Sequence, residues 1–570
     1  MFNRYYQDEL IYLRQLGKEY ARAYPETAKL LAENGSDPDV ERMLEGAAFI
    51  TGRLRQKLDD EIPELTHSLI ETFWPHYLQP IPSIAMVQFE HARPADKEAK
   101  VLPRGTYVDS TPVDGTRCRF RTAFDLTMAP MRIAAVTLRT HAPSLLSIRF
   151  RCHDGVKVGQ LKLERVRLYC AGIQAVASAL HICLTRYAAS VTIVSGTTRI
   201  PLPANSIMPA GFAADEALFG RPGTTFTGFA YLHEYFAFPD KFRFVEIANL
   251  AALAPISTAD EFTLEIALSR VPANMPQLQE QNLLLNCSPV VNEFSHSGSP
   301  IRIDPERREY KVLAAGANQE HFEIISINAI SGVTQGATKA RPYLPLYHQQ
   351  RSGEAVGSYL MRRRPALVGA GADVYISVQG ATPDETLSLE VTCSNRRLPM
   401  ALGINDINQP TDQCPTGVRF RNLTKPTSPL SAPIGTTLEW QLLGHLSLNY
   451  RTLAQVDVLR SLLDLYDIRA QVDQQARQAH RRLLESIAAL NLRPTTIISG
   501  GTPMRGAAVE LTLKDDHFDN EGDMHLFATL LDEVFSQYVG LNSFSQLIVR
   551  GEGNGDVHRR PARLGKRRLL

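Results

Sequence analysis

The sequence predicts an α+β fold, with an N-terminal helical segment, β-rich sandwich or barrel-like middle domains and a C-terminal α/β domain. Three observations predict this order. Apolar residues recur at helical steps over the first eighty residues, short runs rich in branched residues follow Pro80, and helical and alternating patterns mix after residue 441. A length of 570 residues is enough for about four domains.

Residues 1–80 are expected to form a helical assembly segment. The first helix has an apolar stripe at three- and four-residue spacing, formed by Phe2, Tyr6, Leu10, Leu13, Gly17, Tyr20 and Tyr24. Asp37 and Pro38 are typical of an N-cap and a first helical position, and a second helix is expected to run to Leu58. A further helix is expected over residues 63–73.

The first helix has more apolar surface than packing on one face requires. Tyr5 lies beside Tyr6, and Tyr12 falls outside the stripe. Two interpretations stay open: this surface contacts a partner, or it belongs to the core of the same domain. Deleting residues 1–24 would separate them, because only the first interpretation predicts a loss of assembly.

Two β-rich domains are expected next, at residues 81–270 and 271–440. The expected strands are 84–89, 132–139, 145–151, 161–169, 262–268, 323–330, 373–378 and 387–392, with a hairpin at 191–202 and a helix at 175–187. Residues 219–242 are expected to be loop-rich and are dense in aromatic side chains.

The C-terminal α/β domain is expected at residues 441–550. Its elements are helices at 456–466 and 473–490, a half-buried strand at 509–514, a helical face over 527–538 and a last strand at 544–549. Residues 551–570 are rich in Gly and Arg and are expected to be a disordered basic tail.

Composition excludes several classes of partner. The chain has 61 Lys and Arg against 60 Asp and Glu, so its net charge of +1 gives no basic surface for nucleic acid. The N-terminus lacks the apolar region of a secretory signal, and no apolar run approaches the ~18 residues of a spanning helix. Seven cysteines include no C-x-x-C pair, which favours a reduced, cytosolic protein.

Motifs that carry chemistry are not found. The chain has no P-loop and no G-x-S-x-G elbow, and His233-Glu234 lacks the second histidine of a zinc protease motif. Cys152-His153-Asp154 contains triad residue types, but neighbouring residues rarely point at each other, so a strand end and a turn are expected there. We therefore expect no catalytic, cofactor-binding or metal-binding residues. An alternative is a carbohydrate-active or hydrolytic enzyme with β-sandwich domains that uses the aromatic residues of 219–242 as a platform.

Several fragments along the chain together resemble one family. They are Tyr5-Tyr6, Asp37-Pro38-Asp39-Val40-Glu41-Arg42, Tyr77-Leu78-Gln79-Pro80-Ile81-Pro82, Leu102-Pro103-Arg104-Gly105-Thr106, Phe219-Gly220-Arg221-Pro222-Gly223, Glu234-Tyr235-Phe236-Ala237-Phe238-Pro239 and Leu446-Ser447-Leu448-Asn449-Tyr450. In this order they resemble TssF (also called ImpG or VasA), a baseplate subunit of the bacterial type VI secretion system.

The resemblance implies a structural wedge component without catalytic residues. It implies assembly with TssG, with two TssF copies for each TssG, and with TssK and TssE around the VgrG spike, in support of sheath assembly. It also implies a cytoplasmic location at a baseplate that partners dock on the inner-membrane complex.

Candidate interface residues follow from their apolar and aromatic character. We expect contacts with TssG and a second TssF copy at Tyr5, Tyr6, Leu10, Leu13 and Tyr20. Second contacts are expected at Tyr235, Phe236, Phe238, Leu446 and Leu448. A nucleic-acid-binding scaffold is a third interpretation, and it depends only on the basic tail.

Overall fold

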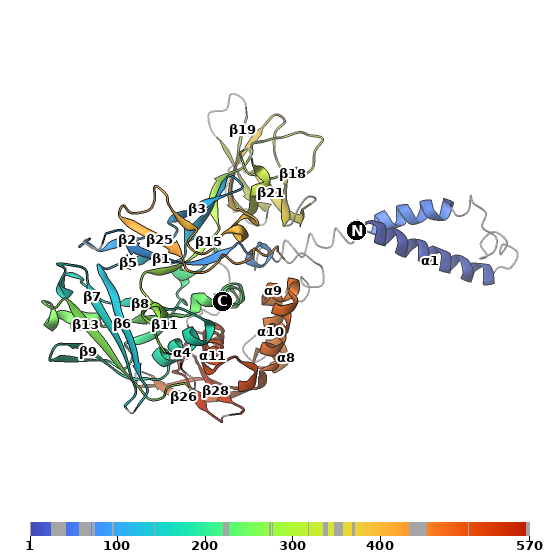
Figure 1. The fold of residues 1–570 in the computed structure, drawn as a ribbon. Coiled ribbons are helices and arrows are strands. Elements are labelled where there is room, and N and C mark those ends of the chain that lie inside the picture. The colour runs from blue at the N-terminus through green and yellow to red at the C-terminus, as the bar shows by residue number, and fades with distance from the viewer. Residues whose placement is uncertain are drawn as a thin grey trace. The chain divides into compact units, whose positions relative to one another are not determined.

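The computed structural model describes most of the chain (Figure 1). The described residues are 2–23, 42–55, 70, 75–93, 96–141, 143–220, 227–272, 275, 277–316, 318–334, 340–346, 357–366, 371–432, 453–499, 501–553 and 555–565. They fall into two compact units, one of residues 1–72 with 435–443 and one of residues 73–434 with 444–570.

The described residues of the first unit include two long helical segments, as the N-terminal periodicity predicts. Helix α1 spans Phe2–Ala23, and residues 42–55 are helical. They approach closely at Gly52, where an added Cβ would lie 3.1 Å from the backbone nitrogen of Tyr6. Arg55 and Glu9 form an ion pair of 2.7 Å across the two helices. The further helix expected at 63–73 lies outside the described residues except for residue 70, which is helical.

The second unit contains the β-rich sheets. The six-stranded sheet has the order β24 (Ile407–Pro410), β3 (Tyr107–Val113), β4 (Thr116–Thr122), β15 (Cys287–Val291), β1 (Ile84–His91), β25 (Val418–Asn422). The five-stranded sheet has the order β10 (Thr198–Leu202), β9 (Ala188–Ser195), β13 (Glu261–Leu268), β7 (Leu145–Cys152), β6 (Met131–Arg139). The four-stranded sheet has the order β11 (Ile207–Ala210), β12 (Phe244–Ile247), β8 (Val166–Cys170), β14 (Leu283–Leu284), and β2 (Lys100–Leu102) pairs with β5 (Leu126–Met128).

A further sheet lies within residues 294–394. Its strands, in order, are β16 (Phe294–Ser297), β23 (Thr386–Ser394), β19 (Glu323–Val333), β20 (Arg341–Pro345), β21 (Gly357–Pro365), β22 (Ala372–Gln379) and β18 (Tyr310–Lys311), with β17 (Ile301–Arg302) paired to β23. Its core is built from the inward side chains of these strands, among them Ile330, Val374 and Leu389. Period-two alternation on β23 puts Leu387, Leu389 and Val391 on the buried face, as expected for a half-buried strand.

Strands from both sides of residue 270 share one sheet. Ile84 of β1 is paired with Val291 of β15, and Phe89 of β1 is paired with Phe420 of β25. The predicted boundary between residues 270 and 271 therefore does not coincide with a break between sheets. A long-range pairing of this kind leaves no local sequence signal.

One helix lies where the sequence predicts loops. Residues Thr227–Ala237 form α5, inside the aromatic stretch 219–242. Its side chains Phe229, Tyr231 and Phe236 are all buried. A helix that is buried around its whole circumference has no solvent-facing polar stripe and no amphipathic period, so the pattern is not recognised as helical. The loop expectation was wrong for this helix.

Helix α5 packs in a layer with two other helices. Helix α11 (Glu521–Gln537) packs on both α4 (Gln174–Thr185) and α5. Figure 1 shows α4 and α11 beside each other. The expected helices at 175–187 and 527–538 correspond to α4 and α11.

The C-terminal part contains helices α8 (Val456–Tyr466), α9 (Ile468–Val472) and α10 (Gln474–Glu485) and a sheet of β26 (Ile487–Ser499), β27 (Thr502–Leu513), β28 (Phe544–Gly551), β29 (Val557–Arg559) and β30 (Arg563–Leu564). Helix α10 ends at Glu485, five residues before the expected end, because the residues from Ile487 on pair with β27.

The basic tail is ordered as far as the structure describes it. β29 and β30 pair with β28, and the Arg560 side chain, 6% exposed, donates a hydrogen bond of 2.7 Å to Thr529 Oγ1. Arg563 forms ion pairs with Asp532 (2.5 Å) and Glu533 (2.7 Å) on α11. Disorder was therefore the wrong expectation for residues 557–564, because these arginines are neutralised or hydrogen-bonded inside the chain.

Candidate interaction surface and pocket

The second helix of the first unit is apolar on two opposite faces. Ala48 and Gly52 are buried and are one turn apart, on the face toward α1. Met43, Ile50 and Leu54 lie on the opposite face and are 76%, 63% and 56% exposed. Because Ala48 and Gly52 are small, the backbone of this helix can approach the backbone of α1 closely. The outer face presents large side chains to solvent, which is typical of a surface that binds another chain.

Helix α1 also exposes large apolar side chains. Ile11, Tyr12 and Leu16 are each about half exposed, at 56%, 57% and 48%. The position of Tyr12 outside the stripe is the sequence feature that indicated extra apolar surface. We call Ile11, Tyr12, Leu16, Met43, Ile50 and Leu54 the hairpin surface.

The predicted interface residues of α1 lie on its half-buried stripe. Tyr5, Tyr6, Leu10 and Leu13 are half-buried, and Tyr5 and Tyr6 border the close approach at Gly52. Tyr20 belongs to α1, but its side chain is outside the described residues. Contacts of these residues with a partner remain a prediction.

The predicted second contacts on α5 and at Phe238, directly after it, pack inside this chain. Phe236 and Phe238 are 6% and 4% exposed, and Phe238 belongs to the core of the six-stranded sheet. Tyr235 is half-buried, with its ring 6.3 Å from that of Phe527 on α11, and burial raises its pKa. A partner contact at these residues stays a prediction. Leu446 and Leu448 lie outside the described residues.

A buried ion pair fixes the end of α5. Glu234 and Lys241 are 1% and 0% exposed and form a salt bridge. The other carboxylate oxygen of Glu234 accepts a hydrogen bond of 3.1 Å from the backbone of Leu218. The His233-Glu234 pair therefore has a structural role, since Glu234 joins α5 to two segments of the chain.

The C-terminal helices are joined by a histidine between two carboxylates. His480 on α10 is 5% exposed, with Nδ1 3.0 Å from Asp467 Oδ2 and Nε2 3.3 Å from Asp464 Oδ1. Burial alone would lower the pKa of His480, but the two carboxylates outweigh it and raise the pKa to about 9. His480 is therefore a cation at neutral pH and holds α10 against α8.

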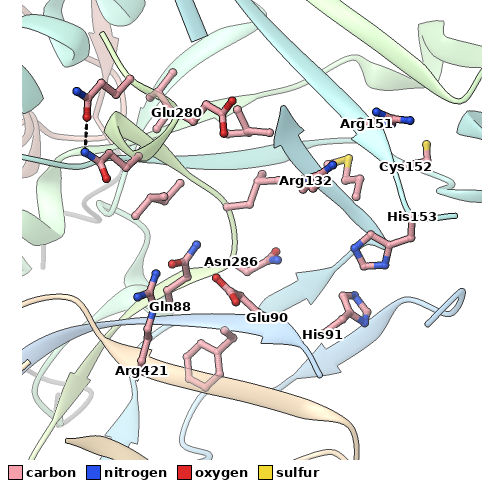
Figure 2. Close-up of a pocket in the computed structure, with 18 of the residues that line it drawn as sticks. Gln88, Glu90, His91, Arg132, Arg151, Cys152, His153, Glu280, Asn286 and Arg421 are labelled. Carbon is pink, nitrogen blue, oxygen red and sulfur yellow. Dashed lines mark hydrogen bonds between the residues drawn. The ribbon is translucent and has the colours of Figure 1, made fainter. Parts of the chain in front are cut away.

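The second unit has a pocket of about 980 Å³ (Figure 2). One wall is formed by β1 and β25, with Gln88, Glu90 and Arg421, and the facing wall by β6 and β7, with Arg132 and Arg151. The segment 279–286, which includes η7 (Glu280–Asn282) and β14, forms the remaining wall. No sequence motif indicates this pocket, because its lining comes from five separate segments.

The triad-like residues of this pocket do not form a nucleophilic site. Cys152 is 6% exposed, and burial raises the pKa of its thiol to about 11, so it is protonated at neutral pH. His153 Nδ1 lies 3.0 Å from the backbone oxygen of Asp96, a contact with the main chain. Within the described residues, no three His, Cys, Asp or Glu side chains are grouped so as to hold a metal ion. In the same part of the chain, no helix has the length and apolar character needed to cross a membrane.

Comparison with known proteins gives one consistent result. A family model described as "Type VI secretion system, TssF" matches residues 1–567. The type VI secretion system component TssF1 of Pseudomonas aeruginosa is 28% identical, with 99% of this chain and 98% of the relative covered.

Two solved structures have a similar fold. A chain in the cryo-electron microscopy structure of a TssK-TssF-TssG baseplate subcomplex of the type VI secretion system matches with a TM-score of 0.75 and 31% identity, covering 92% of this chain and 99% of that chain. A chain of a type VI secretion system baseplate complex matches with a TM-score of 0.65 and 28% identity, covering both chains fully.

Proposed function

Because the chain belongs to the TssF family of the type VI secretion system, we propose that it acts as a structural wedge subunit of the baseplate and not as an enzyme. The similar solved chains come from baseplate complexes, one of which contains TssK and TssG. The proposed partners of this chain are TssG, with two copies of the chain for each TssG, a second copy of the chain, TssK, TssE and the VgrG spike. The proposed location is the cytoplasmic baseplate, docked on the inner-membrane complex through these partners.

The hairpin surface is the observation that carries this proposal. Burying a large apolar side chain contributes about 1.5–3 kcal/mol, so the outward Met43, Ile50 and Leu54 together offer several kcal/mol to a partner helix. Apolar residues at helical spacing on two faces of one helix are typical of a helix inside a bundle. We propose that TssG and the second TssF copy complete this bundle.

The test is co-purification of the full chain with co-expressed TssG and TssK. Ile50→Glu combined with Leu54→Glu places two charges on the outer face and leaves Ala48 and Gly52 unchanged, so the two helices can still pack. We expect binding to weaken by at least about a hundredfold, because two buried apolar contacts are lost. Substitutions at Ile50 and Leu54 test partner binding more directly than substitutions at Tyr6 and Leu13, because the half-buried side chains of Tyr6 and Leu13 also contribute to packing within the first unit.

The matched control is Ile498→Glu on β26, which is 81% exposed in the second unit. It adds one glutamate at an isoleucine that is more exposed than Ile50 or Leu54, and binding should be unchanged. Normal recovery of TssG with the double variant, or an equal loss with Ile498→Glu, would contradict the proposed role of the hairpin surface.

A further inference from the structure

The pocket between β1 and β6 contains a buried polar atom that no residue of the described chain satisfies. Gln88 on β1 is 9% exposed, and its Oε1 is buried without a hydrogen-bond partner among the described residues. An unsatisfied buried acceptor is costly, and native structures contain few of them. Gln88 faces the pocket beside Arg421, its neighbour on β25 (Figure 2). A donor from a ligand in the pocket would satisfy it.

The facing wall carries two like charges directly opposite each other. Arg132 on β6 and Arg151 on β7 are register partners, and neither forms an ion pair with another described residue. Like charges at directly opposed positions destabilise a sheet, and an anion held between them relieves the repulsion. The planar fork of a guanidinium group matches the geometry of a carboxylate or phosphate.

The outer side of β6 also borders the pocket, and η7 and β14 approach this strand without pairing with it. β6 is the last strand of its sheet, and within the described residues no strand pairs with its outer side. Met131, Arg132 and Ile133 at this edge line the pocket. Such an edge can accept an extended peptide as an additional strand.

We propose that this pocket binds an extended, acidic peptide segment of a neighbouring baseplate subunit. A carboxylate of the segment accepts hydrogen bonds from Arg132 and Arg151, one of its N–H groups donates to Gln88 Oε1, and its backbone runs along the edge of β6. This inference depends on the proposed function, because it takes the partner to be a subunit of the same complex.

The rest of the lining favours a peptide over a polyanion. Glu90, Asp154 and Glu280 also line the pocket and balance the charges of Arg132, Arg151 and Arg421, so the pocket suits a segment with a single carboxylate better than a polyanion. Apolar side chains, among them Phe89, Ile133 and Leu283, line it as well and suit the side chains that flank an acidic residue. The volume of about 980 Å³ is at the upper end of ligand pockets, which range over roughly 300–1,000 Å³.

The experiment is site-specific cross-linking in the assembled complex. The photoreactive residue p-benzoylphenylalanine replaces Ile133 in the full chain, the complex with TssG, TssK and TssE is purified through a tag on TssK, and cross-linked peptides are identified by mass spectrometry. We expect a cross-link to a partner segment that contains Asp or Glu. Arg132→Glu combined with Arg151→Glu should lower the yield at least about tenfold, because it replaces attraction by repulsion.

The control is Arg149→Glu on the same strand β7, a charge reversal at an exposed arginine outside the pocket, which should leave the yield unchanged. Gln88→Leu should lower the yield several-fold, with the thermal unfolding midpoint reported for each variant. A complex that assembles without this cross-link, a cross-link to a basic segment, or a yield that survives the double reversal would overturn the inference. A complex that does not assemble at all would instead contradict the proposed function.

Discussion

At the scale of single residues, the buried charged side chains of the second unit form ion pairs and hydrogen bonds that connect segments of the fold. Glu234 and Lys241 are fully buried as a pair, and Arg560 is buried under α11 with Thr529 as an acceptor. A buried charge is tolerated only when it is paired or hydrogen-bonded, so these contacts account for side chains that sequence patterns place on the surface. Basic residues in a C-terminal tail predict disorder, and only the position of acidic Asp532 and Glu533 on α11 shows otherwise.

His480 makes the stability of the C-terminal helices dependent on pH. Its pKa is raised to about 9 in the folded chain, against about 6.5 in an unfolded one, so the folded state binds the proton more tightly. The stabilisation is fully present below pH 6.5 and is lost as pH rises through 9. We expect His480→Gln to lower the free energy of unfolding at pH 6, because it removes the cation between the two carboxylates. The loss should be no more than about 2 kcal/mol, because solvent screens the interaction with the exposed Asp464.

The measurement is urea unfolding of the wild type and the variant at pH 6, 8 and 9.5. The difference between them should shrink with rising pH and nearly vanish at the highest value. His141→Gln, an exposed histidine in a loop, serves as the control and should show no such trend. A constant difference at all three pH values would show that His480 contributes through packing and not through its charge.

At the scale of elements, the sequence predicts those whose pattern is set by one buried face. Helix α8 spans the predicted residues 456–466, and the hairpin of β9 and β10 lies where alternation and a Ser-Gly turn predict it. Helix α5 was missed because it is buried on all sides. Residues 487–490 were assigned to a helix because Ile-Ala-Ala-Leu favours one locally, and pairing with β27 overrides that preference.

The close approach of the two N-terminal helices gives a prediction at this scale. A Cβ at Gly52 would lie 3.1 Å from Tyr6 N and 3.2 Å from Tyr5 O, so Gly52→Leu forces the helices apart and should cost about 1–3 kcal/mol. Gly46 lies in the same helix with nothing within 4 Å of its Cβ position, so Gly46→Ala should stabilise the helix by about 1 kcal/mol.

Amide hydrogen exchange over residues 42–55 measures both effects in the full chain. Exchange should become faster in Gly52→Leu and slower in Gly46→Ala. If both variants slowed exchange, helix propensity alone would account for the segment, and the packing of residues 42–55 on α1 at Gly52 would be contradicted.

At the scale of the whole molecule, patterns along the chain cannot reveal which distant segments pair. β15, β24 and β25 join β1, β3 and β4 in one sheet, although more than three hundred residues separate β1 from β25. The pocket has the same origin, since Gln88, Arg132, Glu280 and Arg421 come together only when these sheets form. The hairpin surface is different. It is local, within residues 1–55, and its part on α1 was predicted from the position of Tyr12, whereas the exposed face of residues 42–55 was not.

A near-zero net charge and an exposed apolar surface together predict how the isolated chain behaves. With a net charge of +1 there is little long-range repulsion to keep molecules apart, and the hairpin surface is then free to contact another copy. We expect the purified chain to self-associate at micromolar concentration, and co-expressed TssG to suppress this by covering the same residues.

The variant Ile50→Lys tests this expectation. It should shift sedimentation velocity profiles toward the monomer, because it adds a charge to the apolar face and repulsion between copies. Val472→Lys, at a side chain 74% exposed on α9, changes the net charge equally and should shift them much less. Equal shifts in the two variants would mean that net charge, and not the hairpin surface, governs association, and the outward apolar face of residues 42–55 would then have no measurable part in it.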